Sequence, residues 1–188
     1  MKSLPCLLLL VTCATPACLS SSPPPAIDYY RVDLPDGEPR LSGPAGALRL
    51  RHVRAAAHIK ERMIWRESGV EVGYSETQRW IEPPVDYLAR AVTGALFHRD
   101  GWVQADSAPL TLDLTLVAFD EVLAPEHVAE VVLEARLARN GDTLLDERIV
   151  RRTPIESPTS ADFARAIGAS LKEAADDLAA HLQDALQP

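Results

Sequence analysis

The sequence predicts an α+β fold, in which a mainly antiparallel sheet carries two helices packed on one face as a two-layer sandwich. Three observations lead to this prediction. Leucines alternate with polar residues over 110–116, as they do in a half-buried strand. Asn140-Gly141 separates two strand-like runs, and this dipeptide is the strongest short signal for a hairpin. Two other segments, at about 84–98 and about 159–186, repeat apolar residues at helical spacing.

The chain ahead of the first helix predicts short strands joined by turns. Residues 27–32 predict a first strand, and the glycines and prolines of 35–46 predict a loop. Residues 47–53 alternate apolar and polar side chains, which indicates a half-buried strand. Residues 63–67 and 70–74 flank a Ser-Gly pair and predict the two strands of a hairpin.

Both predicted helices have clear starts and one apolar stripe. Proline suits a helix start because its φ is preset, so the first helix runs from about Pro84 to His98. The stripe of this helix consists of Val85, Leu88, Val92 and Leu96. The second helix runs from about Thr159 to Leu186 and is about 40 Å long. Its alanine-rich stripe predicts packing against the sheet. The alternative is a helix whose apolar stripe binds a partner.

The strands between the helices include one irregularity. Val117 and Phe119 shift the phase of the leucine alternation, which predicts a bulge near Leu116. Residues 128–139 and 143–152 then form the two strands around the Asn-Gly turn. A type I′ turn needs positive φ at both of its central positions, which asparagine and glycine tolerate.

The N-terminal segment is typical of a bacterial lipoprotein signal. The apolar run Leu7–Val11 follows Lys2, and all three cysteines of the chain lie within the first 18 residues. The wider apolar stretch from Leu4 to Leu19 is interrupted by prolines and threonines and is too short to span a bilayer. The predicted organisation is a signal peptide over 1–17, a Ser/Pro-rich tether over 18–26 and a single domain over 27–188.

Two cysteines compete for the lipid. Cys18 is preferred because the polar tether begins directly after it, and Cys13 is the alternative because Leu10 and Val11 precede it. A third interpretation is an ordinary signal peptide whose cysteines are merely small apolar residues. No aspartate follows either cysteine, which favours a lipid-anchored position in the outer membrane, facing the periplasm.

Composition and motifs argue against several classes of function. The net charge of −8 is unsuited to nucleic acid, which requires a basic face. No two of the five histidines lie three or four positions apart, and the sequence contains no P-loop and no Gly-x-Ser-x-Gly. We therefore expect no enzyme activity, no metal and no cofactor. A hydrolase that uses carboxylates remains the alternative.

Arginines and tryptophans are the remaining candidates for binding. We interpret Arg49, Arg51, Arg54 and the pair Arg151-Arg152 as outward-facing strand positions. The tryptophans, by their size, predict core or rim positions rather than ligand platforms; they are Trp65, Trp80 and Trp102.

The order of several short motifs resembles the ABC-type transport auxiliary lipoproteins, the PqiC/YmbA-like group. The motifs are Tyr29-Tyr30, Trp65-Arg66, Trp80 to Pro83 and Phe119-Asp120, followed by the hairpin and the alanine-rich final helix. The resemblance covers nearly all of 18–188. The departures are the imperfect lipidation motif and Trp65, where the group commonly has tyrosine.

The resemblance implies a non-catalytic subunit of an MCE-type intermembrane phospholipid transport system, at its outer-membrane end. Its implied partners are an MCE-domain protein, through it an ABC transporter, and other copies of the chain in a ring. The candidate contacts with a partner are Trp80, Arg66 and Tyr74. The alternative is an outer-membrane assembly lipoprotein that partners a β-barrel in lipopolysaccharide export.

Overall fold

A computed structural model of the protein describes residues 24–34, 46–67 and 70–187. The predicted signal peptide, Cys13, Cys18 and most of the predicted loop over 35–46 lie outside the described residues. Among the residues of the tether, 24–26 are described and belong to no helix or strand. Within the described part, no helix is both long enough and apolar enough to cross a membrane.

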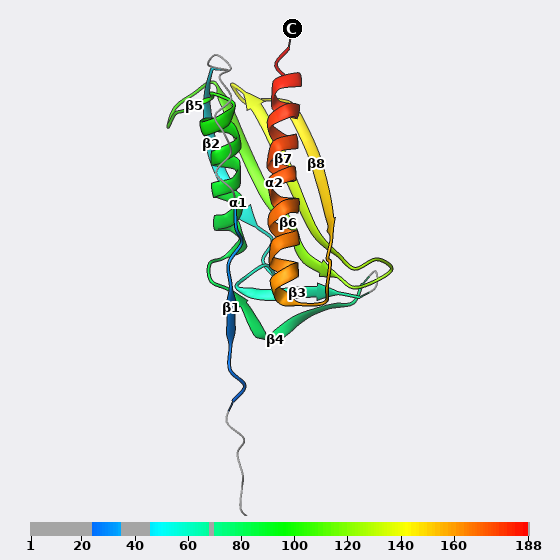
Figure 1. Ribbon diagram of the computed structural model, residues 1–188. Helices are drawn as coiled ribbons and strands as arrows, with labels where there is room; N and C mark the ends of the chain where they lie inside the picture. The colour runs from blue at the N-terminus through cyan, green and yellow to red at the C-terminus, as the bar shows by residue number, and fades with distance from the viewer. Residues whose placement is uncertain (1–23, 35–45, 68–69, 188) are drawn as a thin grey trace, which may run out of the picture.

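Eight strands form one sheet and two helices pack beside it (Figure 1). The strands are β1 (Asp28–Tyr30), β2 (Ala47–Ala55), β3 (Arg62–Arg66), β4 (Val72–Trp80), β5 (Val103–Gln104), β6 (Leu110–Val122), β7 (Val128–Arg139) and β8 (Asp142–Pro154). The helices are α1 (Pro84–Thr93), which continues in wider π-type turns as η1 (Gly94–Arg99), and α2 (Ser160–Asp184).

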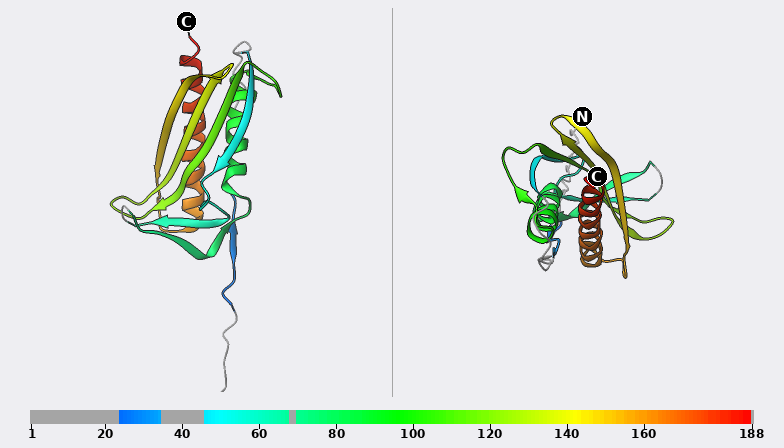
Figure 2. Two further views of the ribbon diagram at one scale, coloured as in Figure 1. Left: turned by 180° about the vertical axis from the view of Figure 1, so that it is seen from behind. Right: turned by 90° about the horizontal axis from the view of Figure 1, so that it is seen from above.

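The long strand β6 is the centre of the sheet. On one side it pairs with β7 along its whole length, and β8 follows β7. On the other side its first half pairs with β2 and its last three residues pair with β3. The sheet then continues from β3 to β4 and β1, and from β2 to β5. Strands β3 and β4 cross the lower end of the molecule, with β1 beside them (Figure 1 and the left view of Figure 2).

The prediction of a mainly antiparallel sheet was wrong, because the sheet is mixed. The pairs β1–β4, β2–β5, β2–β6 and β3–β6 are parallel, whereas β3–β4, β6–β7 and β7–β8 are antiparallel. Turn signals report only pairs of strands that are neighbours in the chain. A parallel pair needs a long crossover, which here holds a hairpin and α1 between β2 and β6.

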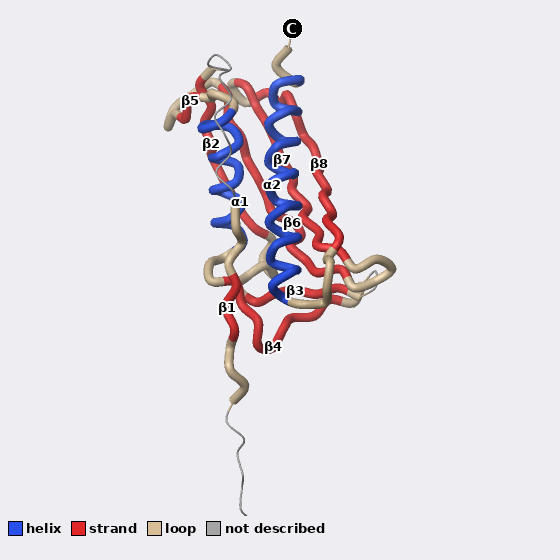
Figure 3. The backbone as a smooth tube through the Cα atoms, in the orientation of Figure 1, coloured by secondary structure: helices blue, strands red, loops and turns tan. Residues whose placement is uncertain are grey.

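Both helices cover the same face of the sheet (Figure 3), so the α+β class and the two layers agree with the prediction. The side chain of Thr159 caps α2 by accepting a hydrogen bond from the backbone N–H of Asp162 at 3.1 Å. A change of register between Leu116 and Ala118 confirms the predicted bulge. Positive φ at Asn140 and Gly141, 54° and 101°, confirms the predicted turn.

Two elements differ from their predicted bounds. Strand β4 reaches Trp80, six residues beyond the predicted end, because β1 and β3 pair with its second half as well. The first helix keeps α-helical turns only to Thr93. In the last turn the backbone N–H of Asp100 donates to the carbonyl oxygen of Ala95, five residues earlier, at 3.1 Å.

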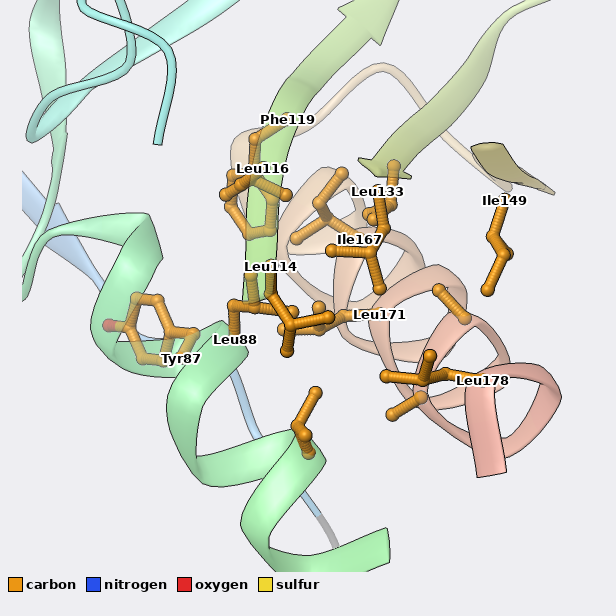
Figure 4. Packing of buried hydrophobic residues seen from close by; sticks show 14 of the residues in the cluster. Tyr87, Leu88, Leu114, Leu116, Phe119, Leu133, Ile149, Ile167, Leu171 and Leu178 are labelled. Carbon is orange, nitrogen blue, oxygen red and sulfur yellow. The ribbon is translucent and has the colours of Figure 1, made fainter. Parts of the chain in front are cut away.

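The core lies between the sheet and the two helices (Figure 4). It contains Leu88 of α1, the buried face of β6 and β7, and the stripe Ile167, Leu171 and Leu178 of α2. Trp80 and Trp102 belong to this core, and the half-buried ring of Trp65 lies over Gly73 of the neighbouring strand. The tryptophans are therefore core and rim residues, as predicted.

Candidate partner-binding face of the sheet

The face of the sheet that the helices leave open carries charged side chains in rows across the strands. Pairing places His52, Asp113, Arg136 and Asp146 in one row. The next row along the strands consists of Arg54, Thr115, Glu134 and Arg148. We call this surface the open face. Asp113, Arg136 and Asp146 alternate in sign across three strands, and Glu134 lies opposite Arg148, so charge adds to the backbone hydrogen bonds between these strands.

Asp113 is the centre of the upper row. Arg51 donates from Nε to Oδ1 of Asp113 at 2.9 Å and from Nη2 to its other oxygen, and Nδ1 of His52 lies 2.7 Å from Oδ1. The hydrogen bonds from Arg51, and then those from His52, hold the pKa of Asp113 below its usual value despite partial burial. The carboxylate of Asp113 therefore stays charged and holds the side chains of Arg51 and His52 on β2 in place.

A shallow hollow of about 430 Å³ opens over these rows. It is lined by charges of both signs, namely Arg51, Arg54, Arg136, Asp113, Glu134 and Asp146. Arg148 donates to Glu134 at 2.8 Å at the edge of the hollow, and both side chains are half-exposed. Such a polar surface suits a protein partner with a matching charge pattern better than an apolar ligand.

Two buried carboxylates and two more exposed arginines form a cluster of four charges at the lower end of the open face. The carboxylate of Glu130, 4 % exposed, accepts hydrogen bonds from Arg66 of β3 and from Arg152 of β8, the latter at 2.6 Å from Nε. Nε of Arg66 also lies 3.6 Å from Oδ2 of Asp120 on β6. Two guanidiniums and two carboxylates thus balance each other, and together they connect four strands.

The cluster acts as a clamp on β3. Only three residues of β3 pair with β6, so its ladder is short. Arg66 adds a hydrogen bond to Glu130 on β7 and an ion pair with Asp120 on β6, which hold the strip of β3, β4 and β1 against the long strands. Desolvation by burial raises the pKa of Asp120 above its usual value, and the hydrogen bond from the backbone N–H of Phe119 and the positive charge of Arg66 oppose this only in part.

Strand β8 is the longest free edge in the described part of the sheet. It has 13 residues and pairs with β7 and with no other strand. Leu144 and Val150 are exposed on it, between charged residues that include Arg148 and Arg152. A free edge of this length can accept a strand of another chain, and its charges oppose unspecific pairing.

The structure separates the three predicted partner contacts. Trp80 is only 1 % exposed and its ring lies in the core, so the prediction that Trp80 touches a partner is wrong for the folded chain. Arg66 and Tyr74 lie on the paired strands β3 and β4. Arg66 is engaged in the clamp, and the half-buried ring of Tyr74 lies under the guanidinium of Arg62, 4.9 Å from Cζ to the ring centre.

The arginines of β2 and β8 lie on one face of the sheet or the other according to the alternation of side chains along each strand. Arg49, Arg51 and Arg54 are exposed on β2, as predicted. Arg152 faces the clamp, whereas Arg151 pairs with Asp177 of α2 on the covered face, so only one of these two faces the open side. Sequence reasoning missed Glu130 as the acceptor of the clamp, because no local pattern links positions on three separate strands.

Histidines form single pairs with acids. His127 lies 2.7 Å from Glu121, and His181 pairs with Glu147. Within residues 24–34, 46–67 and 70–187, no group of three or more histidines, cysteines and acids could hold a metal ion.

Comparison with known proteins identifies the class of this protein. The family model of the ABC-type transport auxiliary lipoprotein component matches residues 32–179, so the chain belongs to that family. The protein is thus a transport-associated lipoprotein. No curated protein matches the chain.

Solved structures share the fold at low sequence identity. A protein of Xanthomonas campestris is 18 % identical, with a TM-score of 0.72 over 85 % of this chain and 100 % of its own. An uncharacterized protein is 14 % identical, with a TM-score of 0.64 over 84 % of this chain and 99 % of its own. A hypothetical protein of Chlamydia trachomatis is 7 % identical, with a TM-score of 0.53 over 74 % of this chain and 96 % of its own.

Proposed function

We propose that this protein is a non-catalytic, lipid-anchored subunit of an MCE/ABC-type system that moves phospholipid between membranes, and that it acts at the outer-membrane end. The observation that carries the proposal is the family match over 32–179. The anchor is Cys18, or Cys13 as the alternative, acylated with chains such as palmitate. The protein works by shape and contact, because the charged side chains of its open face are engaged with one another.

The two ends of the molecule have different tasks in this proposal. The described chain begins at the lower end, beside β1, while α2 ends at the opposite end (Figure 1). An anchor ahead of residue 24 therefore keeps the β1 end near the bilayer and directs the far end into the periplasm. The open face and the β8 edge then face sideways, where an MCE-domain protein docks and links the subunit to an ABC transporter.

Acylation is tested on the mature N-terminus. We expect mass spectrometry and labelling with palmitate to find lipid on the wild-type chain and on Cys13→Ala, and none on Cys18→Ala. If Cys13→Ala loses the lipid and Cys18→Ala keeps it, the anchor is Cys13 instead. An unmodified terminus in the wild type would overturn the anchor.

The partner is tested by recovery of the tagged full chain from membranes in mild detergent. We expect an MCE-domain protein, and less of it with Arg54→Glu and Arg136→Glu, which reverse two charges of the hollow. Arg165→Glu is the matched control, because this exposed arginine belongs to α2 on the other layer. Recovery of an outer-membrane β-barrel instead would favour an assembly lipoprotein.

A ring of copies is a further part of the proposal. Each chain has a long free edge at β8 and short edges at β1 and β5, so edge contacts between copies can close around an axis. Native mass spectrometry of the detergent-extracted protein counts the copies. A single copy at all protein concentrations would contradict the ring.

A further inference from the structure

The strip of β1, β4 and β3 has an outward surface at the lower end of the molecule. Tyr30 pairs with Trp80, and Trp80 is buried in the core. Tyr29, the next residue along β1, pairs with Arg79, which in turn pairs with Arg62. Because neighbouring residues of a strand point to opposite faces, these three side chains face outward.

Apolar side chains are exposed around this strip. Tyr29 is 64 % exposed, Ile27 is 47 % exposed and Ile81 is 59 % exposed. Ile81 lies at the strip because its backbone N–H donates to the carbonyl oxygen of Tyr30 at 2.9 Å. We define the N-terminal face as Ile27, Tyr29, Arg62, Arg79 and Ile81.

The two arginines of the N-terminal face pair with no carboxylate among the described residues. Arg79 donates to the carbonyl oxygens of Ser75, Glu76 and Gln78 at 2.9–3.0 Å. Arg62 donates to the carbonyl oxygen of Ser75 at 3.3 Å and lies over the ring of Tyr74. Both guanidiniums are held in place by backbone, so their positive charges remain available to an anion, although the whole chain has a net charge of −8.

The place where the chain enters β1 indicates which surface the N-terminal face contacts. Twenty-three residues precede Pro24, and the described chain enters β1 at this end of the molecule (Figures 1 and 2). A Ser/Pro-rich tether spans about 3 Å per residue, so an anchor at Cys18 keeps the N-terminal face within about 25 Å of the bilayer. At that separation even a weak contact forms as an intramolecular event.

We infer that the N-terminal face is a second contact with the phospholipid bilayer. Ile27, Tyr29 and Ile81 enter the headgroup region, where apolar and aromatic side chains are favoured. Arg62 and Arg79 contact headgroup phosphates, which guanidinium binds well. The inference rests on the lipid anchor of the proposed function. The contact fixes the domain upright, with the hairpin turn at Asn140 pointing away from the membrane.

The experiment compares two probe positions in the lipidated full chain, reconstituted in vesicles of phosphatidylethanolamine and phosphatidylglycerol. Ile81→Cys places an environment-sensitive fluorophore on the N-terminal face. Val103→Cys is the matched control, because Val103 is 54 % exposed on β5 at the opposite end (Figure 1). At position 81 we expect a blue shift of the emission and quenching by nitroxide-labelled lipids. At position 103 we expect neither. Ile27→Asp should reduce both effects at position 81.

Other outcomes separate this inference from the anchor itself. A chain that floats with vesicles but has equal signals at positions 81 and 103 overturns the second contact and leaves the anchor intact. A chain that does not float overturns the anchor and this inference with it. A blue shift at position 81 that grows with protein concentration in the absence of vesicles assigns the face to a second copy, and also overturns the inference.

Discussion

The ring of Trp80, at the end of β4, meets the ring of Phe119 on β6 edge to face, with centroids 5.3 Å apart. Phe163 of α2 lies 5.5 Å from the same indole, and Tyr87 of α1 lies 6.3 Å from it. One side chain therefore joins the β3–β4–β1 strip to the long strands and to both helices. Edge-to-face pairs of this kind add stability beyond the area that they bury.

Removal of this indole should weaken the whole domain. We expect Trp80→Ala to lower the free energy of unfolding by about 3–5 kcal/mol, because it leaves a large cavity among three aromatic rings. Urea unfolding followed by circular dichroism measures the change. Ile81→Ala is the control, because Ile81 is next to Trp80 in the chain but its side chain is exposed. The free energy of unfolding should change by no more than about 0.5 kcal/mol. Equal effects of the two substitutions would contradict the placement of Trp80 in the core.

The clamp at Glu130 should contribute more than an ion pair at the surface. Glu130→Ala removes a buried carboxylate and leaves the partly buried Arg66 without its main acceptor, so we expect a loss of about 2–3 kcal/mol. Glu134→Ala removes a half-exposed partner of Arg148 two rows away and should cost less than about 1 kcal/mol. Urea unfolding of both variants at one pH tests the difference, and a larger loss for Glu134→Ala would argue against the clamp.

Two aspartates of β6 should give opposite pH dependence. The folded-state pKa of Asp113 is lowered by Arg51 and His52, so its contribution to stability is present above pH 3.8 and is lost as the pH falls through the lowered pKa. The folded-state pKa of Asp120 is raised by burial, beside Arg66, His58 and Glu130. Its contribution therefore declines as the pH rises from 3.8 through the raised pKa.

Unfolding of the wild type, Asp113→Asn and Asp120→Asn between about pH 3 and about pH 8 separates the two effects. The wild type should exceed Asp113→Asn in stability at neutral pH, and this advantage should shrink in acid. Relative to Asp120→Asn, the wild type should lose stability as the pH rises. Parallel curves for all three proteins would be inconsistent with both shifts.

Two helical glycines offer a matched test of packing. A Cβ at Gly94 would meet no atom within 4 Å, so Gly94→Ala should stabilise the protein by about 0.5–1 kcal/mol through helix propensity. A Cβ at Gly168 would lie 3.0 Å from the carbonyl oxygen of Asp33 and 3.2 Å from Cγ1 of Val32. Gly168→Ala should therefore gain less than Gly94→Ala or lose stability. Thermal unfolding ranks the two, and a larger gain at Gly168 would contradict the close approach of residues 32–33 to α2.

Secondary structure was largely predictable from the sequence, because each element leaves a periodic pattern in a short window. The bulge near Leu116 and the Asn140-Gly141 turn were equally local. The parallel pairs were not predictable, since Arg51 and Asp113 are 62 positions apart and no turn residue links their strands. The π-type end of α1 also gave no signal, because its apolar spacing continues through Leu96.

The candidate site was harder to predict than the fold. Trp80 lies just before the proline-rich start of a helix. The sequence does not reveal on which face of the strand its side chain lies, and in the structure that side chain is buried in the core. Arg66 was recognised, but its role depends on Glu130 and Arg152, which only the register of β6, β7 and β8 places beside it. Charge clusters that form across strands require the pairing to be known first.

The central position of β6 also determines how the chain folds. Neither β2 nor β3 can join the long strands until β6 has been made, because each lies parallel to β6 across a long stretch of sequence. Contacts between such distant residues close large loops, which slows folding to milliseconds or longer. Until β6 has been made, β2 and β3 therefore lack their pairing with the long strands, and chaperones that prevent aggregation would protect them during this period.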